Sequence, residues 1–150
     1  MVESSIQRLD YLCNVAPDLL NSIPEVEFSH KSSPEKWSKK EILGHLIDSA
    51  TNNHQRFVRV QFENVPAIIC DQVNWNRQSR YNLMDGKHLI EFWTIYNRHL
   101  ISLIELLSEE DLQRECDIGK DETVTLQWLI VDYLQHLEHH LKQIVEYSMI

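Results

Sequence analysis

Apolar residues recur along four stretches of the chain at the three- and four-residue spacing of an amphipathic helix. The stretches cover about residues 4–22, 38–64, 85–107 and 125–147. Each combines an apolar face with a polar face, so each needs neighbours against which the apolar face can be buried. Four helices of this length predict an all-α fold, a four-helix bundle.

Residues at the ends of these stretches support the predicted boundaries. Ser38 begins the second stretch, and Glu41 follows at the spacing of a capping box, in which each side chain binds the other's backbone N–H. Asp85 and Thr125 stand before the third and fourth stretches and are typical helix N-caps. Pro24 follows the first stretch and closes it, because a proline cannot continue the helical hydrogen bonding.

The connections between the predicted helices differ in length. The segment from Pro66 to Met84 is long, polar and irregular. A connection of this length can cross from one end of a bundle to the other, so consecutive helices need not be antiparallel. In the next connection Ser108 begins what we expect to be one short helical turn. We therefore predict one domain over residues 1–150, with a long crossover between the second and third helices.

Composition excludes several classes of protein. The chain has 150 residues with only 3 Gly and 4 Pro, which favours long helices over a sheet of many strands. The formal net charge of −9, without a compensating Lys/Arg stripe, argues against binding to nucleic acid or to an anionic membrane surface. No stretch approaches the roughly 20 apolar residues that span a bilayer, and the first residues do not resemble a secretion signal. We therefore expect a cytoplasmic location.

Histidines gather in the fourth predicted helix. At about 100° per residue, His136 and His140 lie about 40° apart at one border of the apolar stripe, whereas His139 points to solvent. Two imidazoles four residues apart can share one metal ion. Such pairs also arise by chance, and a histidine at a helix edge is more often a packing or solvated residue. Both interpretations of His136 and His140 remain open at this point.

The second predicted helix offers a partner for this pair. His45 lies beside its apolar stripe, and Ser49, Asn52 and Arg56 continue a polar line along the same border. If this line faced the fourth helix, the two would form a polar pocket, with His45 as a third ligand and the Tyr133 hydroxyl within reach. Three neutral imidazoles with open positions are typical of a catalytic site for Zn, Ni or ferrous Fe.

A second group of side chains would support such a site. A ligating imidazole usually donates its other N–H to an acceptor, and Asp132 or Glu138 could serve as that acceptor.

The three cysteines, Cys13, Cys70 and Cys116, are far apart in the sequence and form no CxxC pair. We therefore expect them to be free, reduced thiols rather than metal ligands.

Three motifs resemble the DinB-like superfamily. Residues 36–49 read KWSKKEILGHLIDS and resemble the second-helix signature of that family, in which a Trp-Ser or Trp-Thr cap leads to a metal-ligating histidine. Residues 65–68, VPAI, resemble the crossover of the branch that contains bacillithiol S-transferases and metal-dependent hydrolases. Residues 136–144, HLEHHLKQI, resemble the last helix with its HxxxH ligands. Together the motifs are specific, and the resemblance covers about residue 9 to the end.

The resemblance implies a four-helix bundle with a three-histidine metal site on His45, His136 and His140. Zinc or nickel is the expected metal, with Fe or Mn as alternatives, and a homodimer is the expected assembly. Well-understood relatives transfer a low-molecular-weight thiol to an electrophile or use one in isomerisation. Gln72 and Gly44 depart from residues that relatives often carry, an acidic residue and a histidine. Both departures bear on the identity of the substrate.

Three functions remain in competition. The first is a metal-dependent thiol S-transferase that acts on small electrophiles with bacillithiol or a similar cosubstrate, whose carboxylates Arg56 or Asn52 would bind. The second is a metal-dependent hydrolase with the same ligands, in which the metal activates water. The third is a non-enzymatic helical binding or stress module whose histidines only pack. The first two act on a small-molecule substrate.

Overall fold

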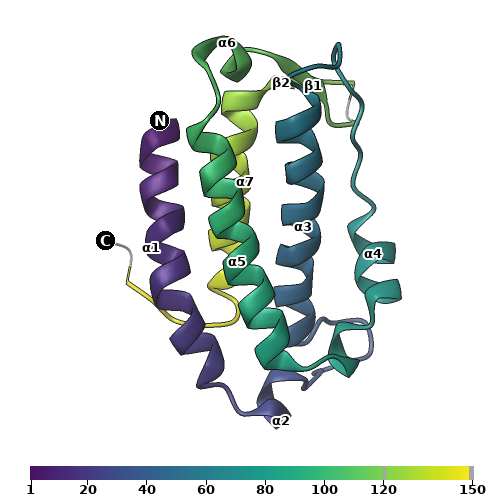
Figure 1. The fold of residues 1–150 in the computed structure, drawn as a ribbon. Coiled ribbons are helices and arrows are strands. Elements are labelled where there is room, and N and C mark those ends of the chain that lie inside the picture. Colours follow the sequence, from purple (N-terminus) through teal and green to yellow (C-terminus); the bar gives the residue numbers. More distant parts are fainter. Residues whose placement is uncertain (120, 149–150) are drawn as a thin grey trace.

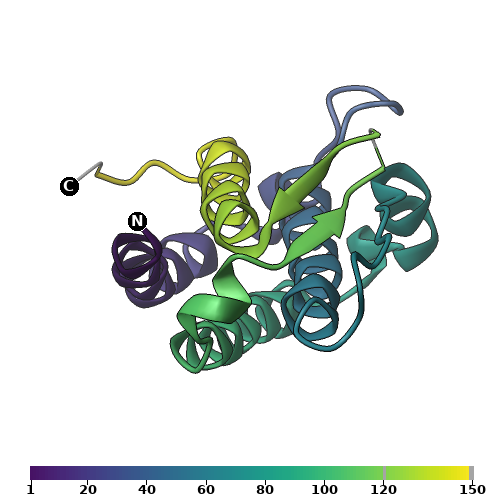
Figure 2. The ribbon, with the colours of Figure 1, turned by 90° about the horizontal axis from the view of Figure 1, so that it is seen from above.

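The computed structural model describes residues 1–119 and 121–148. Four long helices stand side by side in it (Figure 1). They are α1 (Val2–Asn21), α3 (Lys39–Arg59), α5 (Gly86–Glu105) and α7 (Leu126–Leu141). Both α1 and α3 pack against α5 and α7, as the view from above also shows (Figure 2). The predicted four-helix bundle is therefore confirmed, and this arrangement sets α3 directly beside α7.

The predicted apolar stripes form the core of the bundle. Leu46, Leu100 and Leu137 are at most 1% exposed and come from three different helices. Burial of each such side chain stabilises the fold by roughly 1.5–3 kcal/mol. Trp93 is also fully buried, in α5. These leucines of three predicted stripes thus lie in the core, as the pattern of apolar positions indicated.

The crossover between α3 and α5 is more regular than the sequence indicated. It contains the helix α4 (Gln72–Ser79) and the single 3₁₀ turn η1 (Tyr81–Leu83). Asp71 caps α4 by accepting a hydrogen bond from the backbone N–H of Asn74, at 3.2 Å. Asn76 is the one residue of α4 that is buried. A helix without an apolar stripe has no periodic signal, so the expectation of an irregular segment was wrong.

The connection before α7 carries two short strands. The helical turn expected at Ser108 is present as α6 (Glu109–Leu112), with its capping box formed. Strands β1 (Glu115–Asp117) and β2 (Thr123–Thr125) follow and pair antiparallel, which the sequence did not predict. The crossover joins this hairpin, because Ile68 N–H donates to the Asp117 carbonyl and Asp117 N–H donates to the Pro66 carbonyl. These bonds hold the crossover beside the upper end of α3.

Two of the predicted helices extend too far. The structure ends α3 at Arg59 and α7 at Leu141, whereas the apolar pattern continued to about residues 64 and 147. Arg114 explains the first difference, because its guanidinium donates to the carbonyls of Val60 and Glu63 just beyond the end of α3. Val65 then has a left-handed φ of 44°, which is incompatible with a continuing helix.

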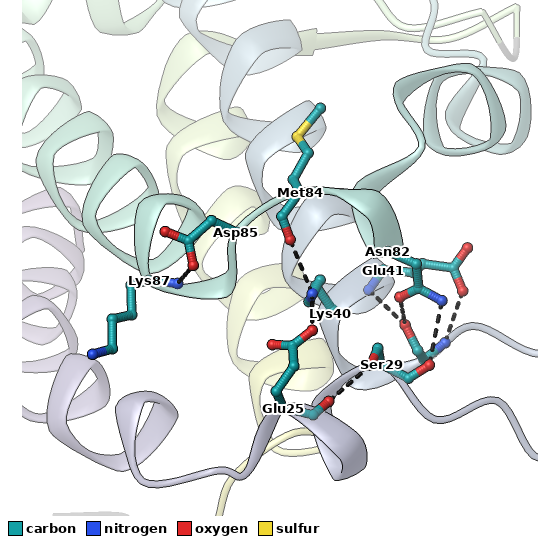
Figure 3. Close-up of polar contacts among 9 residues, drawn as sticks. Glu25, Ser29, Lys40, Glu41, Asn82, Met84, Asp85 and Lys87 are labelled. Atoms are coloured by element: carbon teal, nitrogen blue, oxygen red, sulfur yellow. Dashed lines mark hydrogen bonds and ion pairs between the residues drawn. The ribbon is translucent and has the colours of Figure 1, made fainter.

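The lower end of the bundle is held by buried polar contacts (Figure 3). The short helix α2 (Glu25–Phe28) lies there, and the Glu25 carboxylate binds the ammonium of Lys40, which is 1% exposed. Lys40 also donates to the Met84 carbonyl at 2.9 Å. The predicted capping box of Ser38 and Glu41 is formed beside it. Within the described ranges, no helix is long and apolar enough to cross a membrane.

Candidate metal centre

One face of α3 carries the polar residues of the site. Positions three and four apart share a face of a helix, and the residues at these spacings line a common cavity. They are His45, Asp48, Ser49, Asn52, Asn53 and Arg56. Because α3 lies beside α7, this face meets the HxxxH pair of the last helix. The polar line expected from His45, Ser49, Asn52 and Arg56 therefore faces α7, as predicted.

The structure brings the three predicted histidines together. Nε2 of His45 lies 3.0 Å from Nε2 of His136. One ring nitrogen from each of His45, His136 and His140 lies within 4.8 Å of the other two. Zinc–nitrogen bonds of about 2.0–2.1 Å would set ligand nitrogens roughly 3.3 Å apart in a tetrahedral site. The three rings thus lie close to the separation that one shared ion requires.

Hydrogen bonds orient two of these rings. Nδ1 of His140 lies 3.0 Å from Oε1 of Gln143, an oxygen that can only accept, so His140 carries its proton on Nδ1. Nδ1 of His136 lies 3.5 Å from the Ser49 hydroxyl. The Nε2 lone pair of His140 is then directed away from this contact and suits a metal ion, whereas the Ser49 hydroxyl can donate or accept and so fixes no tautomer of His136. Gln143 was not predicted, whereas Glu138, which was considered for this role, accepts hydrogen bonds from Arg8 instead.

Burial keeps His45 and His136 in the neutral form that a metal ion requires, because it lowers the pKa of both side chains. It lowers the pKa of His45 to about 3, with a further contribution from His136 and His140. It lowers the pKa of His136 to about 4, again aided by the neighbouring histidines. Nδ1 of His45 is buried and has no hydrogen-bond partner among the described residues. Three imidazoles with ring nitrogens this close together form a donor set that fits a borderline divalent metal.

A cavity of about 440 Å³ opens onto two of the histidines. His45 and His136 line it, and the crossover and the turn of the hairpin form its other walls. The wall residues outside α3 and α7 are Ile69, Cys70, Gln72, Ile118 and Gly119. Sequence reasoning did not place these residues, because nothing in the pattern showed that the crossover joins the hairpin.

The predicted pocket residues occupy the cavity in different ways. Arg56 donates from Nη2 to the Ile68 carbonyl at 2.8 Å and so fastens the crossover to α3. Asn52 is buried and donates to the Asp48 carbonyl at 3.0 Å. Tyr133 lines the cavity, but its hydroxyl donates to Oδ1 of Asn97 at 2.6 Å.

A buried carboxylate is the feature that the sequence analysis missed. Asp48 is 3% exposed and follows His45 by three positions, the spacing that could have revealed it. The Tyr81 hydroxyl donates to its Oδ1, while Oδ2 is buried and has no hydrogen-bond partner among the described residues. Burial raises the pKa of Asp48 to about 6, and the hydrogen bond from Tyr81 opposes this shift.

Gly44 makes the contact between Tyr81 and Asp48 possible. A Cβ atom at Gly44 would lie 2.0 Å from Cδ2 of the Tyr81 ring, far inside van der Waals contact. The missing side chain therefore leaves the space that the ring occupies on its way to Asp48. A histidine at this position, as in some sequences that this chain resembles, would displace the ring.

Cysteines make no contribution to the cluster of donor atoms. All three are free thiols, and Cys13 and Cys116 are buried away from the histidines in the core and beneath the crossover. Cys70 is exposed at the cavity, with its sulfur 3.5 Å from Nη2 of Arg56. Burial in the pocket wall raises the pKa of the Cys70 thiol, although Arg56 opposes this.

Comparison with known proteins agrees with this architecture. Residues 8–144 match the family described as the DinB superfamily. The chain belongs to the DinB superfamily. A relative from Oceanobacillus iheyensis, named Putative metal-dependent hydrolase OB0413, is 24% identical over 140 residues, which cover 93% of this chain and 80% of the relative.

A solved structure shares the fold. YfiT from Bacillus subtilis, described as a probable metal-dependent hydrolase with an unusual four-helix bundle topology, superposes with a TM-score of 0.86. The two are 20% identical, and the match covers 95% of this chain and 83% of YfiT. At this identity the likeness establishes the bundle topology, including the long crossover between the second and third long helices.

Proposed function

We propose that this protein is a metal-dependent enzyme in which His45, His136 and His140 hold one divalent metal ion. The observation that carries the proposal is the cavity of about 440 Å³ that reaches His45 and His136. Structural zinc sites are normally closed by four protein ligands, whereas catalytic sites keep positions open for substrate. Zinc or nickel suits three imidazoles best, with iron or manganese as alternatives.

The reaction we propose is the transfer of a low-molecular-weight thiol, such as bacillithiol, to a small electrophile. A divalent metal bound to the three histidines would lower the pKa of a thiol and so supply a thiolate nucleophile near neutral pH. The sulfur then forms a bond to carbon as the leaving group departs with its electron pair. The cavity walls position both reactants, with Ser49, Asn52 and Arg56 available for carboxylate or hydroxyl groups.

Metal content tests the first part of this proposal. Elemental mass spectrometry of untagged protein, purified without added metal, is expected to find about one transition metal ion per chain. His45→Ala and His136→Ala are expected to lose it. His139→Ala is the matched control and should keep it, because His139 belongs to the same helix but lies outside the cluster. A wild-type protein that is empty and also refuses added zinc and nickel would favour a binding module.

Turnover tests the second part. Metal-loaded protein is mixed with monobromobimane and, in turn, with bacillithiol, cysteine, glutathione and coenzyme A. Conjugation that one thiol supports, and that metal removal and His136→Ala abolish, is the expected result. Failure with every thiol would exclude the transferase.

A hydrolase is the second candidate, and the names of the two related proteins favour it. The same histidines would serve, with water in place of the thiol as the nucleophile. Metal-dependent hydrolysis of ester or amide substrates in the absence of any thiol would establish this function. A homodimer and a cytoplasmic location stay predictions from the sequence.

A further inference from the structure

The carboxylate of Asp48 is incompletely bonded within the protein. Its Oδ1 accepts a hydrogen bond from Tyr81, and its Oδ2 is buried without a partner among the described residues. A buried carboxylate oxygen that has lost its water and gained no donor destabilises the folded state. This arrangement therefore suits a ligand that supplies the missing donor.

The position of Asp48 relates it to the histidines. It lines the same cavity as His45 and His136 and lies one helical turn beyond His45 on the same face of α3. Three residues advance about 4.5 Å along a helix axis, so a group at Asp48 would be only a few bonds away from an atom held at the histidines. The Tyr81 ring, seated on Gly44, holds the carboxylate in this place.

Among the residues that the structure describes, no side-chain cation binds the Asp48 carboxylate. Arg56, the guanidinium of the same cavity, directs Nε and Nη2 to the Ile68 carbonyl, and its Nη1 lies 3.5 Å from Oδ1 of Asn53. Asn52 gives its amide to the Asp48 main-chain carbonyl rather than to the carboxylate. Among the described residues, the remaining lone pairs of Asp48 thus have no donor, and Asp48 is one of the residues that line the cavity.

Building on the proposed transferase function, we propose that Asp48 binds the ammonium group of the cosubstrate, which is a β-aminothiol. The sulfur is held at the three histidines, and the ammonium, two carbons away, donates to Oδ2 of Asp48. A charge-assisted hydrogen bond of this kind is stronger than one from a neutral donor, and it is strengthened by exclusion of water. Asp48 thereby selects the thiol.

Three thiols of nearly equal size test this selection. Cysteamine carries an ammonium, 2-mercaptoethanol a hydroxyl and 1-propanethiol a methyl group at the same position. Their dissociation constants are measured by calorimetry on zinc-loaded wild type and on zinc-loaded Asp48→Asn. Because the thiols differ in acidity, the result is the change in the cysteamine-to-propanethiol ratio between the two proteins, in which acidity cancels. We expect Asp48→Asn to lower the preference for cysteamine about tenfold or more.

Two further variants identify the acceptor. Asp132→Asn is the matched control, because it makes the same change at another carboxylate of the same cavity. It should keep the preference for cysteamine, and loss of the preference there instead of in Asp48→Asn would overturn the proposal. Tyr81→Phe keeps the Asp48 carboxylate but removes the hydrogen bond that positions it, so it should lower the preference less than Asp48→Asn does. A loss in Tyr81→Phe as large as that in Asp48→Asn would contradict the assignment.

The outcomes separate this inference from the function on which it rests. If all three thiols bind zinc-loaded wild type with a ratio that Asp48→Asn leaves unchanged, the selection is wrong and the transferase stands. If none binds, both fail. Should Asp48→Asn not fold, carboxyl ¹³C spectra of labelled wild type replace it. The Asp48 resonance should then move with cysteamine and not with propanethiol, and an unmoved resonance would refute the contact.

Discussion

Two buried polar regions lie on the same helix within a few residues of each other, and they are built in opposite ways. Lys40, near the start of α3, is 1% exposed, and its ammonium binds both Glu25 and the Met84 carbonyl (Figure 3). His45 and Asp48, one and two turns later, each contain a buried polar atom without a partner among the described residues. The ammonium of the first region finds its hydrogen-bond partners within the protein, whereas two buried atoms of the second region find none among the described residues.

We associate the region at Lys40 with the stability of the fold and the region at His45 and Asp48 with function. The buried ammonium of Lys40 binds Glu25 and the Met84 carbonyl and so connects α2, α3 and the turn before α5. Removal of this ammonium leaves both groups without their donor. Buried polar atoms without partners reduce stability and are retained where a ligand completes them. A cavity adjoins the incomplete region. We therefore expect changes near Lys40 to alter folding and changes near His45 to alter binding.

The largest expected effect is the acid sensitivity of the metal-free protein. The folded-state pKa values of His45 and His136, about 3 and 4, lie below the usual value of 6.5. As the pH falls below 6.5 the unfolded chain takes up protons that the folded chain refuses, so stability is lost and continues to fall toward pH 4. Between pH 7 and 4.5 this loss should be about 4 kcal/mol.

Chemical denaturation at several pH values measures this loss. The reference is the metal-free double variant His45→Gln/His136→Gln, which should lack it. Asp48 acts in the opposite direction, because its raised pKa of about 6 makes the folded state bind a proton more readily as the pH falls. Asp48 is present in both proteins, so the difference between them isolates the histidines. Parallel curves for the two proteins would show that the imidazoles are not buried as neutral groups.

The buried Lys40 of the other region should contribute nearly as much to stability, although the side chain of its partner Glu25 is 62% exposed. Lys40→Ala leaves the Met84 carbonyl without its donor and removes the packing of the side chain, so we expect a loss of about 3 kcal/mol. Metal content should not change. Lys39→Ala is the matched control, since Lys39 pairs with Glu27 at the surface and should contribute less than about 1 kcal/mol. Urea unfolding measures both, and equal effects would refute the contrast between the buried Lys40 and the partly exposed Lys39.

Gly44 lies between the two regions, and its substitution should destabilise the fold by about 2 kcal/mol. Alanine in a helix is usually about 1 kcal/mol better than glycine, but here its Cβ would meet the Tyr81 ring at 2.0 Å. The double variant Gly44→Ala/Tyr81→Ala removes the clash. In the Tyr81→Ala background, alanine at position 44 should therefore become stabilising, as thermal unfolding can show. If it stays destabilising there, the ring is not the cause.

Much of this architecture could be predicted from the sequence, for a specific physical reason. The stripes that place Leu46, Leu100 and Leu137 in the core are local patterns, and a helix converts spacing directly into a face. The same conversion placed His136 and His140 together and left His139 outside the cluster. The two hydrogen bonds of the capping box at Ser38 are equally local, because both join Ser38 to Glu41.

The features that were missed depend on contacts between distant parts of the chain. The hairpin forms a wall of the cavity only because residues 66–68 bond to Asp117, and no local pattern encodes that pairing. The Tyr133 hydroxyl donates to Asn97, a partner 36 residues earlier. Gly44 and Gln72 were noticed only as departures from a family pattern. The structure places Gly44 against Tyr81 and Gln72 in the cavity wall, so both departures lie at the pocket.

The smallest predicted effect concerns Gln143, which completes the orientation of one histidine. Its Oε1 accepts from Nδ1 of His140 and so fixes the tautomer whose Nε2 is free. Gln143→Leu removes the acceptor and should weaken zinc binding about tenfold, the lower end of such effects because this contact is exposed to water. Gln143→Glu keeps an acceptor oxygen and should bind zinc at least as well as wild type.

Competition with a chromophoric chelator measures both affinities without any assay of turnover. If Gln143→Leu and Gln143→Glu weaken zinc binding equally, the side chain acts through the fold of the last turn and not through His140. If neither changes the affinity, water replaces the acceptor and the orientation comes from packing alone. A tenfold loss restricted to the leucine variant would show that the site at His45, His136 and His140 is still incomplete without a residue beyond the last helix, in contrast to the self-contained ion pair at Lys40.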